Sequence, residues 1–347
     1  MRKMNAIGSL MAALTVTALS GFMTAQAQTA EPEAAIVPGA VWNDTEGNPI
    51  NAHGGGILYH DGTYYWYGEY KKGKTVLPEW ATWECYRTDV TGVSCYSSQD
   101  LLNWKFEGIV LPAVKNDKEH DLHPGNVLER PKVIYNRKTG KFVMWMHIDS
   151  ADYSKACAGV AVCDTPTGEF EYLGSFRPNG AMSRDQTVFA DDDGRAYHIY
   201  SSEHNATLYI SELTDDYLRP AGRFTRNFIK RSREAPAVFK HDGKYYMLSS
   251  GCTGWDPNQA ELAVADSIMG EWRTIGNPCV GPDADKTFFS QSTFVQKVMG
   301  KKDMYIAMFD RWNKTDLEDS RYVWLPLSFE DGEIRIPWRD KWSPDEL

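Results

Sequence analysis

The sequence has little positive charge and few cysteines, and each scarcity excludes a class of protein. Its 347 residues include 37 Lys and Arg against 47 Asp and Glu, which gives a formal net charge of −10 at pH 7. An acidic chain does not favour nucleic acid or an anionic membrane surface as a partner. None of the six cysteines has the C-x-x-C spacing of a zinc site, and we expect neither a metal nor a cofactor.

Long apolar runs are missing after the first 27 residues. Residues 1–27 begin with basic side chains, continue through small apolar residues and end on an Ala-x-Ala motif, the pattern of a cleaved signal peptide. No later run approaches the roughly 18 residues that a membrane helix needs. The sequence therefore predicts a single domain, residues 28–347, that is exported to the periplasm or secreted and has no membrane partner. Export permits disulfides, and Cys85 and Cys95 could pair across a hairpin, but the sequence does not choose a pairing.

One hairpin pattern occurs five times. Each copy opens on a polar residue, runs as a short strand into a turn glycine, and leaves as a second strand rich in aromatic residues. The opening residue lies nine positions before the turn glycine in four copies and eleven before it in the second copy. The five opening residues are His53, Glu129, Asp185, Glu234 and Gln291. Five units of this size predict an all-β fold, a five-bladed β-propeller.

A propeller brings the opening residues together, because the innermost strand of every blade lines the central axis. Three of the five opening residues are carboxylic acids: Glu129, Asp185 and Glu234. Carboxylates that converge on one cavity are costly unless they bind a ligand or have shifted pKa values. Glu234 alone could be a structural acid, but the set as a whole favours a functional site.

Two carboxyl groups that flank a bond are the minimal requirement for glycoside hydrolysis. Glu234 precedes an apolar Ala-Pro-Ala-Val segment, so we expect burial to raise its pKa and keep it protonated as a general acid. Asp185 would supply a negative neighbour that orients Glu234 and raises its pKa further. A neutral polysaccharide or oligosaccharide is the substrate that suits this site, and exposed aromatic side chains would stack on its sugar rings.

These residues and their contexts resemble glycoside hydrolase family 43, whose members are inverting five-bladed propellers. The resemblance extends over essentially all of residues 28–347. Asp185 in Ser-Arg-Asp-Gln-Thr-Val-Phe matches the pKa modulator of the family, and Glu234 in Arg-Glu-Ala-Pro-Ala-Val-Phe matches its general acid. The base aspartate that opens the first blade in the family is replaced here by His53, which puts the usual base in doubt.

The departure at His53 resembles the exo-β-1,3-galactanase branch of the family, which shares the Ala-His-Gly-Gly-Gly segment, the Glu-Arg-Pro-Lys motif and the glutamine of the fifth copy. This resemblance implies that Gln291 handles the attacking water as its imidic-acid tautomer and that Glu129 binds the terminal sugar. A neutral amide is a poor base, so Glu129 stays open as an alternative base. His53 is a third candidate, but beside three glycines we expect it to shape the pocket floor.

Further sugar contacts follow from the same resemblance and from positions near the predicted funnel. The resemblance implies Tyr153 and Thr253, and more weakly Glu84 and Asn205. Trp255, Glu69, Asp310 and Arg311 lie at strand ends close to the funnel, where a packing role is as plausible as a sugar contact; among them we count Trp255 as a substrate contact.

The resemblance implies an inverting, exo-acting enzyme that releases galactose from the β-1,3-galactan backbone of arabinogalactan. An α-L-arabinofuranosidase of the same fold is the nearest alternative, because the two differ only in which sugar hydroxyls the pocket contacts. A non-catalytic sugar-binding propeller is the alternative from another class. The missing base aspartate favours it, and the pair of Glu234 and Asp185 argues against it, since a lectin needs no acid with a raised pKa.

Overall fold

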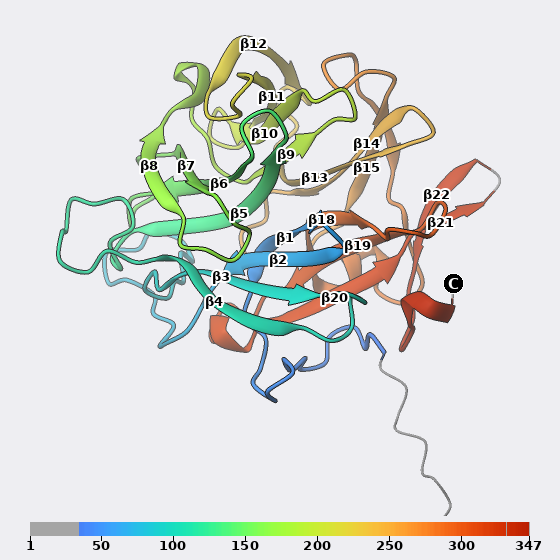
Figure 1. The fold of residues 1–347 in the computed structure, drawn as a ribbon, viewed down its shortest axis with the longest axis horizontal. Helices are drawn as coiled ribbons and strands as arrows, with labels where there is room; N and C mark the ends of the chain where they lie inside the picture. Colours follow the sequence, from blue (N-terminus) through green and yellow to red (C-terminus); the bar gives the residue numbers. More distant parts are fainter. Residues whose placement is uncertain (1–34, 331, 347) are drawn as a thin grey trace, which may run out of the picture. The chain divides into compact units, whose positions relative to one another are not determined.

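A computed structural model describes residues 35–330 and 332–346, and the predicted signal peptide at residues 1–27 lies outside them. These residues form an all-β structure (Figure 1). The first sheet contains β1 (His53–His60), β2 (Thr63–Glu69), β3 (Gly92–Ser98) and β4 (Lys105–Pro112). The second contains β5 (Val127–Asn136), β6 (Lys141–Asp149), β7 (Cys157–Cys163) and β8 (Glu171–Phe176). The third contains β9 (Gln186–Ala190), β10 (Ala196–Ser202), β11 (Thr207–Leu213) and β12 (Pro220–Asn227).

The remaining strands form a fourth four-stranded sheet and two three-stranded sheets. The fourth contains β13 (Arg233–His241), β14 (Lys244–Gly251), β15 (Glu261–Ala265) and β16 (Arg273–Gly276). The fifth contains β18 (Gln291–Lys297), β19 (Tyr305–Arg311) and β20 (Arg321–Pro326). The sixth contains β17 (Cys279–Val280), β21 (Ser328–Glu330) and β22 (Glu333–Pro337). Short 3₁₀ turns are η1 (Pro178–Gly180), η2 (Ala284–Phe289), η3 (Leu317–Asp319) and η4 (Pro344–Glu346).

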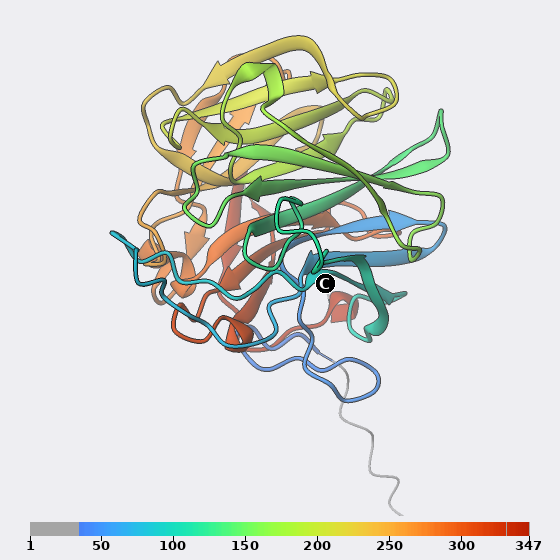
Figure 2. The same ribbon diagram turned by 90° about the vertical axis from the view of Figure 1, so that its left-hand side faces the viewer.

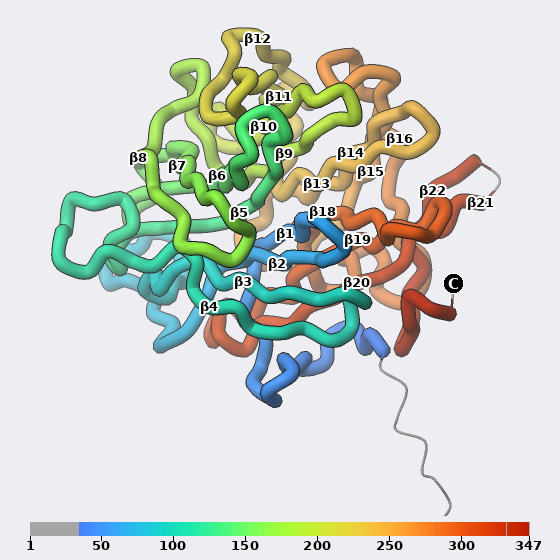
Figure 3. The backbone as a smooth tube through the Cα atoms, viewed as in Figure 1, coloured from blue at the N-terminus to red at the C-terminus, as the bar shows by residue number. Residues whose placement is uncertain are grey.

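The innermost strands of the first five sheets surround a common axis. β1, β5, β9, β13 and β18 contact one another in that order, and β18 returns to β1. In Figures 1 and 3 the blue β1 accordingly lies next to the orange β18, although more than 200 residues separate them in the sequence. This closed arrangement confirms the prediction of an all-β propeller.

The predicted number of five blades is wrong, because the described residues form six sheets. The repeat counted only hairpins that open at the axis, and the sixth sheet has no strand there. Its strands come from the segment after β16 and from the C-terminal tail, and β22 pairs in parallel with β17. β22 also contacts β20, so the tail supplies a strand on the outer side of the last repeat.

The five predicted hairpins are present, and their turns explain the repeated glycine. The turn glycines are Gly62, Gly140, Gly194, Gly243 and Gly300, and each has a φ between 70° and 84°. This left-handed conformation is one that glycine adopts without steric cost. A left-handed glycine therefore recurs in each hairpin loop, although the loops range from two residues between His60 and Thr63 to seven between Lys297 and Tyr305.

A bulge follows the opening residue in four of the five inner strands. The pairing register shifts between His53 and Gly56 in β1, and at equivalent places in β5, β13 and β18. The residue directly after the opening one is left-handed in three strands, at Gly54 (φ 57°), Arg130 (φ 51°) and Ala235 (φ 54°). A bulge re-aims the side chains beside it, so these positions turn toward the axis.

An aromatic cluster joins the first sheet to the sheet of β18–β20. The ring of Trp66 lies 4.6 Å from that of Trp324 and 5.4 Å from that of Trp104, and all three are fully buried. Such pairs contribute about 0.5–1.5 kcal/mol each beyond their buried area. The cluster therefore stabilises the contact between the first and the last repeat.

Gly68 in β2 lies against the backbone that leads into β1, and this contact predicts a stability effect. A Cβ atom at Gly68 would lie 2.1 Å from the carbonyl carbon of Ala52, where backbone has to move. We expect Gly68→Ala to lower the free energy of unfolding by about 1–3 kcal/mol, the usual cost of overpacking, as measured by urea denaturation. Gly125→Ala is the control, because its Cβ would meet only the ring of His123; equal stability of both variants would contradict the prediction.

The six cysteines all lie within the described residues, and they form no disulfide. All six are free thiols, and the possible pair of Cys85 and Cys95 is not formed. Cys95 lies in β3, whereas Cys85 lies in the loop between β2 and β3 and not on a strand opposite it. None of the helical segments in the described part of the chain has the length and apolar character that crossing a membrane requires.

Candidate active site

A cavity of about 680 Å³ lies at the end of the axis where the inner strands begin. Its floor comes from the opening positions of β5, β9, β13 and β18, and its walls come from loops that follow the second strand of each sheet. Inner and second strands are antiparallel, so these two groups of residues meet at one end of the propeller. The volume lies in the range of sites for small ligands.

Glu234 is buried at the cavity floor, with 9% of its surface exposed. Its Oε1 accepts a hydrogen bond from the amide of Gln291 at 3.1 Å, and its Oε2 accepts one from Asn205 at 3.4 Å. Burial and the nearby charge of Asp185 raise the pKa of Glu234 to about 8, although Cys252, Arg130 and Gln291 act in the opposite direction. Glu234 is therefore protonated at neutral pH, and the acid can donate a proton to a bound molecule.

Asp185 is held beside Glu234 by two groups that fix its position. Its Oδ2 accepts a hydrogen bond from the backbone N–H of Ala235 at 3.1 Å and lies 2.9 Å from Nε of Arg130. Ala235 directly follows Glu234 and occupies the bulge of β13. The carboxylate of Asp185 therefore anchors the backbone from which the Glu234 side chain departs.

Arg130 connects three sheets across the axis. It lies in β5, and its guanidinium reaches Asp185 next to β9 and, at 2.6 Å, the amide oxygen of Gln291 in β18. A third bond runs from Nη1 to the carbonyl of Ser292 at 3.1 Å. Only 5% of Arg130 is exposed, so it is a buried cation among the carboxylates.

The hydrogen bonds of Gln291 define which of its amide atoms is which. Oε1 accepts bonds from Arg130 and, at 3.1 Å, from the indole N–H of Trp312, and neither partner can accept a hydrogen bond. Nε2 donates to Glu234 and to the hydroxyl of Ser250, at 3.1 and 2.9 Å. Gln291 is therefore an ordinary amide whose four bonds are all made.

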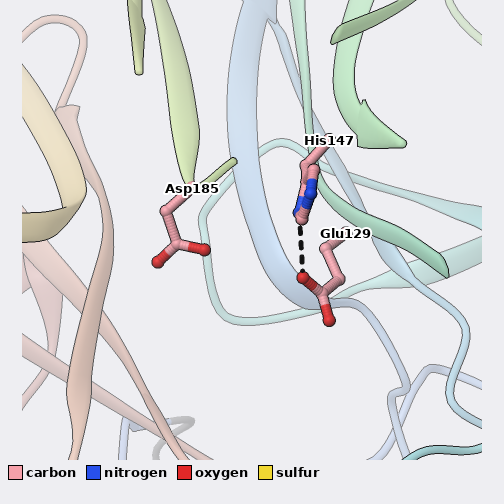
Figure 4. Close-up of side chains that lie close together, drawn as sticks. All are labelled: Glu129, His147 and Asp185. Carbon is pink, nitrogen blue, oxygen red and sulfur yellow. Dashed lines mark hydrogen bonds and ion pairs between the residues drawn. The ribbon is translucent and has the colours of Figure 1, made fainter. Parts of the chain in front are cut away.

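Glu129 and His147 form a buried ion pair on the other side of the floor, as Figure 4 shows. Nδ1 of His147 donates to Glu129 at 3.0 Å and Nε2 donates to Asp149 at 2.9 Å, while the hydroxyl of Tyr153 donates to Glu129 at 2.7 Å. Burial alone would lower the pKa of His147, but the two carboxylates raise it to about 9. Burial alone would raise the pKa of Glu129, but His147, Lys71 and Tyr153 lower it to about 2. Glu129 is thus permanently ionised at neutral pH.

Glu129, His147 and Asp185 together have the spacing of a metal site. Each offers one potential ligand atom, and these atoms lie within 4.8 Å of one another (Figure 4). Both ring nitrogens of His147 donate hydrogen bonds, so neither has a lone pair free for a metal. Asp185 already carries an ion pair with Arg130. The chemistry of this cluster therefore does not fit a metal ion.

Two buried lysines complete the charge balance near the floor. Lys71 lies 2.5 Å from Glu69 and 5.7 Å from the centre of the Trp312 ring, on the cavity wall. Lys132 lies within the axis, where its Nζ donates to the carbonyl of Gly54 at 2.6 Å. Burial and the charge of Arg130 lower the pKa of Lys132 to about 7.

The structure brings most of the predicted residues to the cavity. Glu129, Asp185, Glu234 and Gln291 lie at its floor, and Tyr153, Asn205, Trp255 and Glu69 also line it.

Three predicted sugar contacts lie elsewhere. His53 is completely buried, stacks on Tyr322 and lies 3.5 Å from Asp310, and it does not line the cavity. The hydroxyl of Thr253 is bonded within its own loop, to Asp256 at 2.6 Å. Glu84 is exposed and forms an ion pair with Lys314 at 2.6 Å. None of these three residues lines the cavity, and a contact of any of them with substrate stays a prediction.

Several cavity residues escaped the sequence analysis, and two of them had a recognisable signal. Arg130 follows Glu129 directly, and three converging carboxylates require a buried cation nearby. His147 is the cross-strand partner of Glu129, a position that hairpin arithmetic could have found. No comparable signal marked the other lining residues: Lys71, Trp83, Asp152, Ser154, Met182, Arg184, His204, Cys252, Gly254 and Trp312.

Comparison with known proteins shows which family and which solved structures this chain resembles. The family model of glycosyl hydrolases family 43 matches residues 56–313. A GH43 β-1,3-galactosidase solved with galactodeoxynojirimycin is 45% identical with a TM-score of 0.83, covering 89% of this chain and 100% of that chain. An exo-β-1,3-galactanase from Phanerochaete chrysosporium solved with galactose is 37% identical, with a TM-score of 0.80. The match covers 89% of this chain and 68% of the galactanase. An exo-β-1,3-galactanase from Clostridium thermocellum is 39% identical, with a TM-score of 0.78. The match covers 89% of this chain and 66% of that galactanase. The search of curated proteins found no match.

Proposed function

Because the chain belongs to glycosyl hydrolase family 43, we propose that it is an inverting, exo-acting enzyme that releases galactose from the β-1,3-galactan backbone of arabinogalactan. The family membership makes it a glycoside hydrolase that acts on carbohydrate. The choice of galactan is supported by the relatives named above, which are galactosidases and galactanases.

The observation that carries the proposal is the environment of Glu234. A general acid for glycoside hydrolysis has to be protonated at the working pH and to reach the glycosidic oxygen. Glu234 faces the cavity and has a pKa raised to about 8 by burial and by Asp185. We assign Glu234 as the general acid. Asp185 is the group that orients it, through the N–H of Ala235, and raises its pKa.

The group that activates water is either Gln291 or Glu129, and each would need its hydrogen bonds rearranged. In inverting enzymes the acid and the base are about 6.5–9.5 Å apart, yet the amide of Gln291 touches Glu234 at 3.1 Å. Arg130 and Trp312 would also have to release Oε1 before it could carry the proton of an imidic acid. Glu129 is ionised, but Tyr153 and His147 occupy its two oxygens, and its low pKa makes it a weak base.

Small-anion rescue separates these two candidates. We expect the alanine variant that has lost the water-activating group to lose about 10²–10⁴-fold in turnover and to recover activity with sodium azide, because azide attacks the sugar directly. The variant that has lost only a sugar contact should show a raised KM and no response to azide. Turnover of β-1,3-galactotriose by Gln291→Ala and Glu129→Ala, with and without azide, gives the result. If azide restores the activity of neither variant, neither Gln291 nor Glu129 is the base.

The proposed substrate is tested by incubating residues 28–347 with linear β-1,3-galactan and resolving the released sugars over time. Galactose as the first product supports the proposal, and α-configured galactose by NMR at early times establishes inversion. A parallel reaction contains an α-L-arabinofuranoside. Arabinose from that reaction, with no galactose from the first, would replace the proposed substrate by an arabinofuranoside.

A further inference from the structure

The loop between β2 and β3, residues 70–91, crosses the rim of the cavity, and we call it the strap (light blue in Figure 2). At its tip, Glu84 forms an ion pair with Lys314 at 2.6 Å, and its carbonyl accepts the indole N–H of Trp255 at 2.7 Å. Lys314 follows β19 and Trp255 follows β14. The tip of the strap is therefore attached to two other sheets.

The strap is also attached on its opposite side and near its base. The ring of Trp83 packs edge-on against the ring of Tyr153, which lies in the loop after β6, and the ring centroids are 5.3 Å apart. Near the base, the N–H of Gly73 donates to Glu318 at 3.0 Å, and Thr75 accepts the N–H of Leu317 at 2.8 Å. The strap is thus connected to the loops of the second, fourth and fifth sheets.

One part of the rim lacks such a connection. His204 and Asn205 belong to the turn after β10 and line the cavity. Within residues 35–330 and 332–346, no hydrogen bond, ion pair or ring contact given by the structure joins this turn to the strap. The strap therefore covers the rim of the cavity on the side of the second, fourth and fifth sheets. Beside the third sheet, at His204 and Asn205, the strap makes no such contact among the residues that the structure describes.

Building on the function proposed above, we propose that the strap determines the mode of attack: it closes the cavity on one side, so that only a chain end entering past His204 and Asn205 reaches Glu234. A polysaccharide that is cut internally has to leave the cavity in two directions. The ties through Glu84 and Trp83 block the second direction. The strap is therefore a specificity-determining element, and its residues need not touch the reacting atoms.

Lys314 is the best single position at which to open the strap. Its Nζ lies between Glu84 at 2.6 Å and Asp256 at 3.4 Å, so it neutralises two carboxylates at once. Lys314→Glu places three acids together, and their repulsion should detach the tip. Adding Glu84→Lys exchanges the charges and should reattach it. Lys105→Glu is the matched control, because it breaks a surface ion pair with Glu107 on the outer strand β4.

Limited proteolysis shows whether the strap has detached, independently of activity. The strap contains Lys74 and Arg87, which are trypsin sites. We expect Lys314→Glu to be cut there faster than the wild type, and the charge exchange to reverse this effect. Equal cleavage of the wild type and Lys314→Glu would overturn the inference that this ion pair holds the strap.

The products from linear β-1,3-galactan then show what the strap does. We expect the wild type to release galactose alone, and Lys314→Glu to raise the initial ratio of oligosaccharides to galactose about tenfold, which corresponds to a loss of about 1.4 kcal/mol of closure. Turnover of a small aryl β-galactoside should stay at the wild-type level in all variants. A detached strap with galactose still the sole product would refute the proposal. A wild type inactive on galactan refutes the proposed function instead, and the comparison is then made on the glycan that the wild type does cleave.

Discussion

Replacing Glu234 by glutamine should lower the turnover of β-1,3-galactan by about 10²–10⁴-fold, the range that general acid catalysis supplies. The introduced amide has one acceptor oxygen, which can keep the 3.1 Å hydrogen bond from Gln291, and only the longer 3.4 Å bond from Asn205 is lost. The side chain keeps its size and stays uncharged, so binding of β-1,3-galactotriose should remain close to that of the wild type. The loss should shrink for a dinitrophenyl galactoside, because that leaving group departs without protonation. Initial rates and titration calorimetry measure the two effects. Unchanged turnover of galactan would exclude Glu234 as the acid.

The pH dependence gives an independent check on the same residue. Because the pKa of Glu234 is raised to about 8 and the acid acts in its protonated form, kcat/KM should fall as the pH rises through about 8. Glu234→Gln should lose this basic limb. The raised pKa of Glu234 also makes the free energy of unfolding depend on pH. Between pH 4.5, the ordinary pKa of a glutamate, and about pH 8, the folded state holds a proton that the unfolded state releases, so the free energy of unfolding falls as the pH rises. Glu107→Gln, on the outer strand β4 and away from the cavity, should keep the basic limb of kcat/KM.

Replacing Arg130 by methionine should abolish detectable activity and lower the free energy of unfolding by about 3–5 kcal/mol, the usual cost of leaving a buried charge without its partner. The substitution removes the cation from Asp185 and a hydrogen bond from Gln291. Lysine cannot replace the forked guanidinium, so Arg130→Lys should also fail to restore activity. Urea denaturation and turnover of galactotriose measure the two losses.

A surface arginine provides the comparison for Arg130. Arg195 forms a close ion pair with Asp193, but both side chains are about half exposed. Exposed pairs contribute about 0–1 kcal/mol, so Arg195→Met should have little effect on stability and none on activity. A cost for Arg130→Met as small as that for Arg195→Met would mean that the buried charges at the axis compensate one another without it.

The arrangement of the opening residues could be predicted because it depends on features that a sequence displays. A turn glycine follows a polar residue at nine positions in four copies and at eleven in the second, which aligns the inner strands. Closure of the propeller then brings Glu129, Asp185, Glu234 and Gln291 to one cavity. The raised pKa of Glu234 could also be anticipated, since an apolar segment follows it and Asp185 opens the preceding repeat. The number of sheets could not, because the sixth sheet is built from the tail and has no opening residue.

The details of the site depend on backbone conformations that the sequence does not display. In a regular strand the side chain after Glu129 would point to the opposite face of the sheet. The left-handed Arg130 reverses this expectation, and neither Arg130 nor Ala235 is a residue type that signals such a conformation. His53 does not line the cavity although the same bulge follows it, because its ring packs on Tyr322 and lies beside Asp310. Glu84 and Thr253 lie in loops, whose hydrogen bonds are not repeated from one sheet to the next, so the repeat could not place their side chains.

The bulge behind four of the five opening residues also bears on how such a protein can diversify. It separates the position that carries chemistry from the strand that follows, where pairing and the apolar face resume in the same register in β1, β5, β13 and β18. A substitution at one opening position therefore leaves the hydrophobic pattern of its sheet intact. The four positions that precede a bulge can therefore differ in residue type, as His53, Glu129, Glu234 and Gln291 do, while the strands that follow them keep the same pairing.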